Sequence, residues 1–187
     1  MSEVFGNLCG IDEAGRGPIA GDLVMAGCVL QKKIDGLNDS KKLTEKKREA
    51  LYELIIKDSI YHIVKFSAKQ IDDDGISLCI KKGLLEILDT IKSDEFLFDG
   101  NSNFGVVKLQ TMIKADAKVA EVSAASIIAK VTHDRDILLE AKKYPEYQFE
   151  KHKGYGTALH IEMIKKHGYC EIHRRSYKIK ALEPSLF

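Results

Sequence analysis

Residues 7–30, NLCGIDEAGRGPIAGDLVMAGCVL, contain two apolar runs joined by a short glycine-rich connection. We predict a short buried strand over residues 7–12 and a second strand over residues 22–30, in which alternate side chains share one face. The side chains on that face are Val24, Ala26, Cys28 and Leu30. Gly21 and the tight connection between the runs favour a β-hairpin. The first strand of this hairpin ends in two adjacent carboxylates, Asp12 and Glu13.

The remaining chain continues with both strand and helix patterns. Short apolar stretches at residues 60–67, 95–100 and 106–109 predict three more strands. Amphipathic spacing predicts a helix N-capped by Thr44, a second helix near residues 80–91, a third over 122–143 and a fourth near 157–167. The apolar faces of the first three are expected to contain Leu51, Leu54 and Ile55; Ile80, Leu84, Ile87, Leu88 and Ile91; and Ala124, Ile127, Ile128, Val131 and Leu138. This order predicts an α/β fold with a mixed sheet.

The composition is that of a globular protein: 44% of the 187 residues are hydrophobic and 30% are charged. This length suits a single domain, which we expect to consist of a core over residues 1–142 and a basic C-terminal segment over 143–187 that packs on it. No apolar run is long enough to span a bilayer, and charges near the N-terminus argue against a secretory signal. Four scattered cysteines without a CxxC pair indicate reduced thiols in the cytoplasm. They are Cys9, Cys28, Cys79 and Cys170.

The net charge of +1 conceals a segregation of charge along the chain. Residues 31–49 carry seven Lys or Arg against four acids, and residues 142–180 carry ten against four. The remainder is therefore acidic. Such a distribution suits a polyanionic partner whose cleavage requires cations, although lysines that only solvate surface helices would give the same pattern.

Carboxylates terminate two of the predicted strands. Asp12 closes the first strand, Asp99 lies at the end of the strand over 95–100, and Asp116 precedes the third helix. If the two strands are neighbours in the sheet, these acids meet in one cleft. Several ionised carboxylates share a small volume only when cations neutralise them, and an all-oxygen site suits Mg²⁺ or Mn²⁺. Two such ions about 4 Å apart activate water and stabilise the leaving oxygen of a phosphodiester.

Each acidic feature is also common without a metal. A strand-terminal aspartate is often a turn or cap residue, and Asp116 could serve only the helix dipole. We interpret the run Asp72, Asp73 and Asp74 as a capping loop before Gly75. Asp134 is open to two readings, a carboxylate near the site or, more commonly for this spacing, a helix ion pair.

The glycines of the connection do not form a nucleotide-cofactor motif. Gly15, Gly17 and Gly21 give GxGxxxG rather than GxGxxG, and Pro18 would fit poorly in a phosphate loop. The sequence also lacks the GKS/T of a P-loop.

Several stretches together resemble the ribonuclease HII family, whose members cleave RNA in RNA–DNA hybrids. They are GIDEAGRGPIAG, NDSKKLTEKKRE, FLFDGN, KADAKVAEVSAASIIAKV and HKGYGT followed by His160, in the family's order and over nearly the whole chain. The first and fourth stretches are highly specific. The resemblance implies a ribonuclease H-like fold with a five-stranded mixed sheet and a C-terminal helical segment.

The resemblance also implies roles for individual residues. Four acids match the metal-binding catalytic carboxylates of the family: Asp12, which would bridge two Mg²⁺ or Mn²⁺ ions, with Glu13, Asp99 and Asp116. Residues 15–17 match the turn that reads the 2′-hydroxyl of the ribonucleotide, and Tyr155 matches a tyrosine that stacks on a sugar at an RNA–DNA junction. The residues of that turn are Gly15, Arg16 and Gly17, and the resemblance also places Ser40, Lys41 and Lys42 near the substrate backbone.

These roles agree with elementary chemistry. Only the 2′-hydroxyl distinguishes RNA from DNA at one position, and glycines let the backbone approach it without an intervening Cβ. The guanidinium of Arg16 can hold a phosphate. Lys41, Lys42, Arg174 and Arg175 are expected to contact phosphates irrespective of sequence.

The histidines carry weaker expectations. His133 stands where the family often has arginine, and we expect it on the helix surface. We expect the other four in the C-terminal half to be surface or phosphate-side residues, not metal ligands; they are His152, His160, His167 and His173.

The resulting expectation is a monomeric, metal-dependent endoribonuclease acting in ribonucleotide repair. Its partners would be RNA–DNA hybrids and duplex DNA containing a ribonucleotide, which it would nick on the 5′ side to leave 3′-hydroxyl and 5′-phosphate ends. Two alternatives stay open: a catalytically silent hybrid-binding module, and a two-metal nuclease or strand-transfer enzyme that cuts DNA. The four acids disfavour the first, and Tyr155 and the turn at 15–17 disfavour the second.

Overall fold

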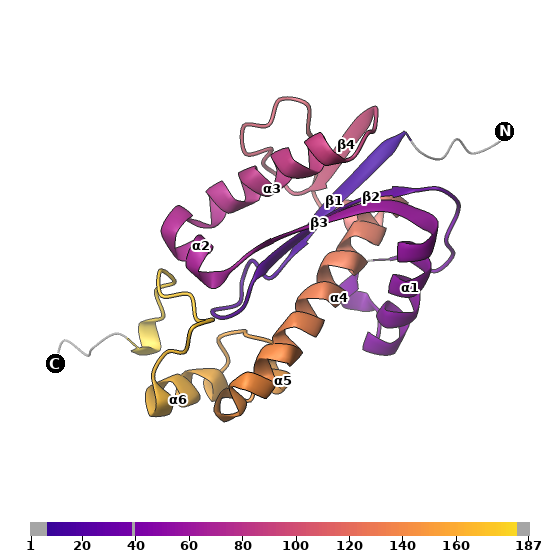
Figure 1. The fold of residues 1–187 in the computed structure, drawn as a ribbon. Coiled ribbons are helices and arrows are strands. Elements are labelled where there is room, and N and C mark those ends of the chain that lie inside the picture. The colour runs from indigo at the N-terminus through magenta and orange to yellow at the C-terminus, as the bar shows by residue number, and fades with distance from the viewer. Residues whose placement is uncertain (1–6, 39, 183–187) are drawn as a thin grey trace.

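The computed structural model describes residues 7–38 and 40–182, and its centre is a five-stranded mixed sheet with the order β3-β2-β1-β4-β5 (Figure 1). Strands β1 and β2 pair antiparallel, as do β2 and β3, whereas β1–β4 and β4–β5 pair parallel. The sheet confirms the predicted fold class and hairpin. The strands are β1 (Leu8–Ala14), β2 (Leu23–Leu30), β3 (Ser59–Phe66), β4 (Glu95–Asp99) and β5 (Gln110–Met112).

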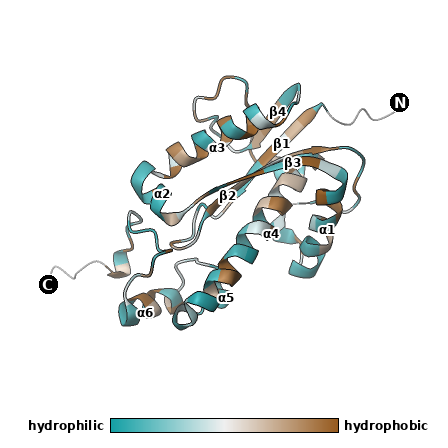
Figure 2. Cartoon of the chain, viewed as in Figure 1, coloured by the Kyte–Doolittle hydropathy of each residue, from teal (hydrophilic) through white to brown (hydrophobic). Residues whose placement is uncertain are grey.

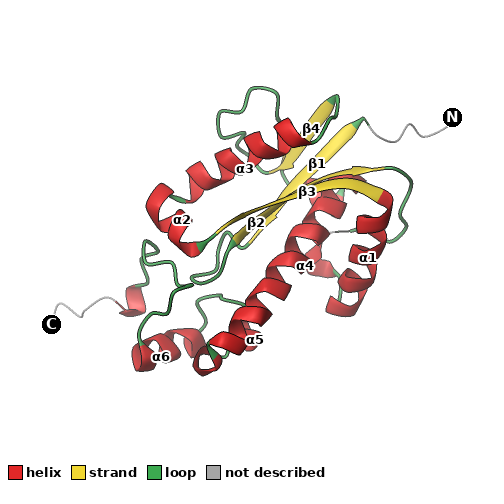
Figure 3. Ribbon diagram, in the orientation of Figure 1, coloured by secondary structure: helices red, strands yellow, loops and turns green. Residues whose placement is uncertain are grey.

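Helices cover both faces of the sheet (Figure 3). One face is covered by α1 (Glu45–Asp58) and the long α4 (Ala120–Lys143), and the other by α2 (Ala68–Asp74) and α3 (Ile76–Thr90). Two further helices follow α4, namely α5 (Phe149–His152) and α6 (Ala158–His167). Short 3₁₀ turns occupy Ser40–Lys42, Ala115–Ala117, Pro145–Tyr147 and Lys180–Leu182.

Strand β2 is buried along its whole length because it lies between two apolar layers (Figure 2). The predicted face, Val24 to Leu30 in steps of two, packs under α1 and α4. Leu23, Met25 and Val29 point the other way, into the core under α3. Alternation along one strand therefore supplies both halves of the core.

The N-terminal end of α4 packs directly on β1. A Cβ atom added to Gly10 would lie 2.2 Å from the backbone of Glu121 and Val122, so only glycine allows this contact. The close packing fixes the helix, and the 3₁₀ turn before it, relative to the end of β1.

Some details differ from the sequence predictions. The fifth strand is Gln110–Met112, not residues 106–109: Val106 and Leu109 are buried in turns, while the strand that pairs with β4 exposes all its side chains and so has no apolar pattern. Leu54 is 48% exposed on α1. On α4, Ile137 is buried and Leu138 only partly so. The Thr44 N-cap is confirmed, since its hydroxyl accepts from the Lys47 N–H.

The C-terminal segment reaches back to the β1–β2 connection. The N–H of Ile19 donates to Gly154 O and that of Gly21 donates to Ile172 O, both at 2.9 Å. A β-bridge joins Ala20 to His173. Within the described residues, no helix is both long and apolar enough to cross a membrane.

Candidate active site

Three aspartates predicted from the sequence meet at one edge of the sheet. Asp12 lies in β1 and Asp99 ends β4; these strands are parallel neighbours in which Ile11 pairs with Phe98, so the two aspartates follow in register. Asp116 comes from the 3₁₀ turn before α4. One carboxylate oxygen from each aspartate lies within 4.8 Å of the others. The structure thus assembles a three-carboxylate cluster from segments far apart in sequence.

Hydrogen bonds hold the cluster together. The Asp99 carboxylate accepts from the N–H groups of Ala115 and Asp116, at 3.3 and 3.4 Å, which ties the 3₁₀ turn to the end of β4. The Asp12 carboxylate accepts from the N–H of Glu13 at 2.8 Å. The acids are therefore placed by backbone geometry as well as by packing.

Glu13 lines the same cavity of about 420 Å³ as the three aspartates. Its Oε1 lies 3.6 Å from the Arg16 guanidinium. Its Oε2 is buried and has no hydrogen-bond partner among the described residues. A buried carboxylate oxygen without a donor is the state expected of a ligand for a cation.

Burial raises the pKa of Asp12 well above its usual range, and the charges of Glu13 and Asp99 raise it further, while the Ser126 hydroxyl opposes them. Burial also raises the pKa of Glu13, against the lowering effect of Arg16. Asp12 and Glu13 therefore resist ionising in the absence of a cation. The donor set consists of oxygen atoms only, so it fits Mg²⁺ or Mn²⁺ and not a soft metal.

The predicted residues of the 3₁₀ turn 40–42 occupy two different environments. Lys41 and Lys42 are exposed and line the cavity of the acids. Ser40 is only 2% exposed, and its hydroxyl lies 2.9 Å from that of Ser126, which in turn bonds to Asp12. Ser40 thus contacts the acidic cluster through one intermediate side chain.

The turn at residues 15–17 and Tyr155 lie side by side. A Cβ on Gly17 would be 3.7 Å from Cε1 of the Tyr155 ring, which is itself 44% exposed. Gly15 has a φ of 86°, and a Cβ there would lie 2.3 Å from Asp22 O. The Arg16 side chain is 53% exposed and lies over the Phe104 ring, 5.9 Å from its centroid. The turn thus presents an open, glycine-lined surface next to the Tyr155 ring.

Arg174 was expected to contact phosphate, and this expectation is wrong because the residue is 0% exposed. Its guanidinium donates to Gly15 O at 2.6 Å, to Gly21 O at 2.8 and 3.0 Å and to Arg16 O at 3.4 Å. The Tyr177 hydroxyl accepts from it at 3.1 Å and donates to Arg16 O at 2.9 Å. Arg174 therefore fixes the backbone of the turn, a role that its sequence position beside exposed Arg175 does not indicate.

Four histidine expectations are also wrong. His133, His152, His160 and His173 are between 0% and 7% exposed, whereas His167 is exposed as expected. His133 packs beneath Gly15, and its Nδ1 lies 3.1 Å from the Asp134 carboxylate. Asp134 itself forms the helix ion pair, 2.8 Å from Lys130. Burial of Asp134 opposes ionisation, but the bonds from His133 and Lys130 lower its pKa.

Asp72 has a role that its sequence context did not suggest. It lies within α2 rather than in a capping loop, and its carboxylate accepts from the N–H groups of Arg175 and Ser176, both at 2.9 Å. Those hydrogen bonds anchor the segment that carries Arg174.

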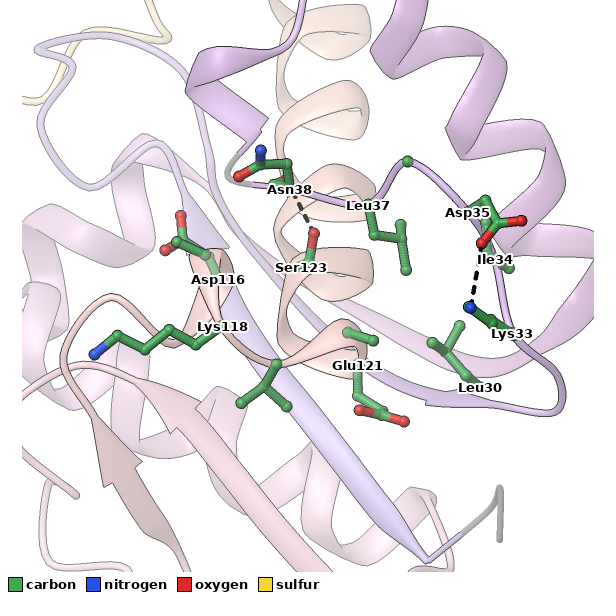
Figure 4. A pocket seen from close by; sticks show the side chains of 14 residues that line it. Leu30, Lys33, Ile34, Asp35, Leu37, Asn38, Asp116, Lys118, Glu121 and Ser123 are labelled. Carbon is green, nitrogen blue, oxygen red and sulfur yellow. Dashed lines mark hydrogen bonds and ion pairs between the residues drawn. The ribbon is translucent and has the colours of Figure 1, made fainter. Parts of the chain in front are cut away.

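A second cavity, of about 500 Å³, lies beyond Asp116 between the start of α4 and residues 33–38 (Figure 4). The Ser123 hydroxyl donates to Asn38 O across it at 2.9 Å, and Lys33 pairs with Asp35 at 3.7 Å. Asp12, Glu13 and Asp99 line the other cavity, which we therefore take as the candidate active site.

The comparisons with known proteins identify the family and agree with the fold. Residues 9–180 match the family described as Ribonuclease HII. A protein from Sulfurovum sp. described as Ribonuclease HII is 64% identical over 96% of each chain. The RNase HII of the PCNA:RNase HII complex from Archaeoglobus fulgidus has a TM-score of 0.81, with 28% identity over 92% of this chain and 96% of that one. Ribonuclease H2 from Pyrococcus horikoshii has a TM-score of 0.78, with 31% identity over 91% and 93%.

Proposed function

The chain belongs to the ribonuclease HII family and is a ribonuclease H acting on RNA–DNA hybrids, and we propose that it cuts with two metal ions and also nicks duplex DNA 5′ to an embedded ribonucleotide. The products would carry 3′-hydroxyl and 5′-phosphate ends. The observation that carries the proposal is the approach of Asp12, Asp99 and Asp116 to within 4.8 Å, in a cavity that opens beside two lysines.

The metal site would consist of the three aspartates and Glu13. When bound, Mg²⁺ or Mn²⁺ activates water and stabilises the leaving oxygen of the phosphodiester. The protein's part is to hold the acids in place: the N–H groups of Ala115 and Asp116 fix Asp99, and that of Glu13 fixes Asp12. Glu13 Oε2, which has no hydrogen-bond partner among the described residues, would supply a further oxygen ligand.

The turn at 15–17 and Tyr155 would recognise the RNA strand. Because Gly17 has no Cβ, the sugar of a ribonucleotide can approach the backbone next to the Tyr155 ring. The exposed guanidinium of Arg16 can hold a phosphate, and the bonds from Arg174 keep the turn in one conformation. A preorganised surface discriminates by the 2′-hydroxyl, which DNA lacks.

Lys41 and Lys42 would contact the phosphates of the substrate backbone, as their exposed positions at the rim of the acidic cavity allow. Ser40 would support Asp12 through Ser126.

All residues of the proposal come from one chain, so we propose that a monomer is active. The free thiols of the described structure agree with a reducing cytoplasm, where repair of DNA-embedded ribonucleotides would take place.

The proposal is tested by incubating the protein with a labelled DNA duplex that contains one central ribonucleotide, in the presence of Mg²⁺, Mn²⁺ or EDTA. An all-DNA duplex is incubated in parallel as the control. The expected result is one metal-dependent nick 5′ to the ribonucleotide, with a 3′-hydroxyl end that a polymerase extends. Cleavage of the all-DNA duplex would favour a DNA nuclease on the same fold. Tight binding without cleavage in any metal would favour a binding module.

A further inference from the structure

A chain of hydrogen bonds runs through buried histidines to the backbone of Tyr155. The N–H of Cys170 lies 2.9 Å from His173 Nδ1, and His173 Nε2 lies 3.0 Å from His160 Nε2. At the far end, His160 Nδ1 lies 2.9 Å from the carbonyl oxygen of Tyr155. His160 and His173 are 0% and 2% exposed. None of the catalytic steps proposed above uses these rings.

The two ends of the chain fix the direction of every bond in it. The N–H of Cys170 can only donate, so Nδ1 of His173 accepts. A neutral His173 then carries its proton on Nε2 and donates to His160. His160 accepts there, so its own proton is on Nδ1, where it donates to Tyr155 O. One tautomer of each ring satisfies all three bonds.

The neutral state of both rings is favoured by their surroundings. Burial lowers the pKa of His160 to about 4 and that of His173 to about 4, with smaller contributions from the neighbouring rings, among them His152, which stacks on His160 at 4.2 Å. Protonation of either ring would also place two donors against each other, because every nitrogen of a charged histidine donates. At neutral pH the chain of bonds is therefore complete.

The carbonyl held by His160 belongs to the loop that contacts the RNA-reading turn. Gly154 O, one residue earlier, accepts from the N–H of Ile19, and Ile19 O accepts from the N–H of Arg174, both at 2.9 Å. Tyr155 O also accepts from the N–H of Thr157 at 2.8 Å, so its two lone pairs are both occupied. The loop is thus held by a backbone hydrogen bond at Gly154, by a second one at Tyr155 and by the His160 ring, which also bonds to Tyr155 O.

We propose that His160, oriented by His173, is a positioning residue that holds Tyr155 against the turn at 15–17 and thereby sets the affinity for a substrate with an RNA–DNA junction. This rests on the proposed role of Tyr155 in reading the substrate. His160 touches neither the substrate nor the acids. His160 acts through a single hydrogen bond to the backbone carbonyl of Tyr155. A residue with only a packing role would not depend on that hydrogen bond.

Two substitutions of similar size separate positioning from packing. The amide of His160→Asn lies near the position of Nδ1 and can still donate to Tyr155 O. The amide of His160→Gln reaches the position of Nε2, keeping the contact with His173 and losing that with Tyr155. Both variants remove the aromatic ring, so a packing role predicts similar effects for the two.

The test compares KM and kcat on the single-ribonucleotide duplex for both variants, for Tyr155→Ala and for the two double variants. We expect His160→Gln to raise KM about tenfold, corresponding to ~1.4 kcal/mol, with kcat little changed. His160→Asn should stay within about threefold, the scale of a well-replaced hydrogen bond. In the Tyr155→Ala background, the effect of His160→Gln should disappear.

Each other outcome has a defined meaning. If Tyr155→Ala raises KM but the two His160 variants behave alike, the positioning role is wrong and the proposed function stands. If Tyr155→Ala leaves KM unchanged, the proposed role of Tyr155 fails, and the positioning role fails with it. Should the variants not fold, ¹⁵N NMR of the unaltered protein decides: protons on His160 Nδ1 and His173 Nε2 are expected, and the opposite tautomers would overturn the inference.

Discussion

The fully buried guanidinium of Arg174 donates to the carbonyl oxygen of Gly15 at 2.6 Å, across 159 residues of sequence. The same side chain reaches Gly21 O twice. Burial lowers the pKa of Arg174, yet the planar fork of donors finds carbonyl partners on three residues of the β1–β2 connection. The C-terminal segment thus controls the shape of a turn next to the acids.

Replacing Arg174 by lysine should destabilise the protein. A lysine ammonium cannot reproduce the fork, so one or more carbonyls at Gly15 and Gly21 would lose their donor, at a cost of about 1–3 kcal/mol each. We expect a lower free energy of unfolding in urea and weaker nicking of the single-ribonucleotide duplex. Arg175→Lys is the matched control, because that side chain is exposed. Equal stability of the two variants would contradict the role assigned to Arg174.

Gly15 and Gly17 should respond differently to alanine. Gly15 has a φ of 86°, and its Cβ would meet Asp22 O at 2.3 Å, so Gly15→Ala should unfold at clearly lower urea concentration. At Gly17 the nearest atom would be 3.7 Å away, so Gly17→Ala should keep its stability within about 0.5 kcal/mol, as for an unstrained surface substitution.

The methyl group of Gly17→Ala would nevertheless occupy the surface offered to the ribose. We expect kcat/KM for the single-ribonucleotide duplex to fall at least tenfold while the fold is unchanged. Nicking at the normal rate by a stably folded Gly17→Ala would show that the sugar does not approach this residue.

Asp12→Asn should abolish cleavage while leaving hybrid binding largely intact. In the unaltered protein, metal binding should raise the melting temperature, since a ligand at 100 times its Kd stabilises by about 2.7 kcal/mol. The variant should lose most of that increase. Without metal, the Asp12→Asn variant should be no less stable than the unaltered protein. The substitution removes a buried carboxylate, and burial and two neighbouring acids both oppose the ionisation of that carboxylate.

Asp94→Asn, an exposed substitution before β4, is the control for Asp12→Asn. Differential scanning fluorimetry with and without Mg²⁺, together with a gel-based cleavage assay, measures these effects. Near-normal turnover by Asp12→Asn would remove this residue from the metal site.

The buried histidines predict a loss of stability in mild acid. Unfolded histidine has a pKa near 6.5, and in the folded protein those of His160 and His173 are lowered to about 4. Between these values the unfolded chain binds more protons, so the stabilisation present above pH 6.5 is lost as pH falls towards 4, on the order of 3 kcal/mol per ring.

Urea unfolding at pH 7, 6 and 5 measures this loss as a difference between proteins. His160→Asn should show a shallower decline than the unaltered protein, and the exposed His167→Asn should not. Identical pH slopes for all three proteins would mean that the two rings are not held neutral.

Much of the site could be predicted because local patterns determine it. Asp99 ends β4 and Asp12 lies in the last half of its parallel neighbour β1, so the pairing brings the two acids together; Asp116 precedes a helix that packs on β1 through Gly10. The edge strand β5 was misplaced because its exposed residues carry no alternation, whereas buried Val106 and Leu109 lie beside it in turns.

The C-terminal segment could not be predicted in the same way. Lysine- and arginine-rich sequence indicates a solvated surface, but Arg174 and three histidines are buried by contacts with residues more than 100 positions away or with one another. The burial of Arg174 depends on carbonyl oxygens of the β1–β2 connection, which only the folded chain brings near. The burial of Ser40 could not be predicted for a similar reason, since its hydrogen bond to Ser126 spans 86 residues.

Mn²⁺ bound to this protein in a crystal can be located directly from its anomalous diffraction. If the carboxylates form the catalytic centre, crystals grown with Mn²⁺ and an uncleavable hybrid will show anomalous peaks among Asp12, Asp99 and Asp116, with Glu13 as a further ligand. The peaks will be absent from Asp12→Asn crystals or strongly reduced. A bound hybrid with no Mn²⁺ at these carboxylates, or with Mn²⁺ only elsewhere, would contradict the metal-dependent mechanism.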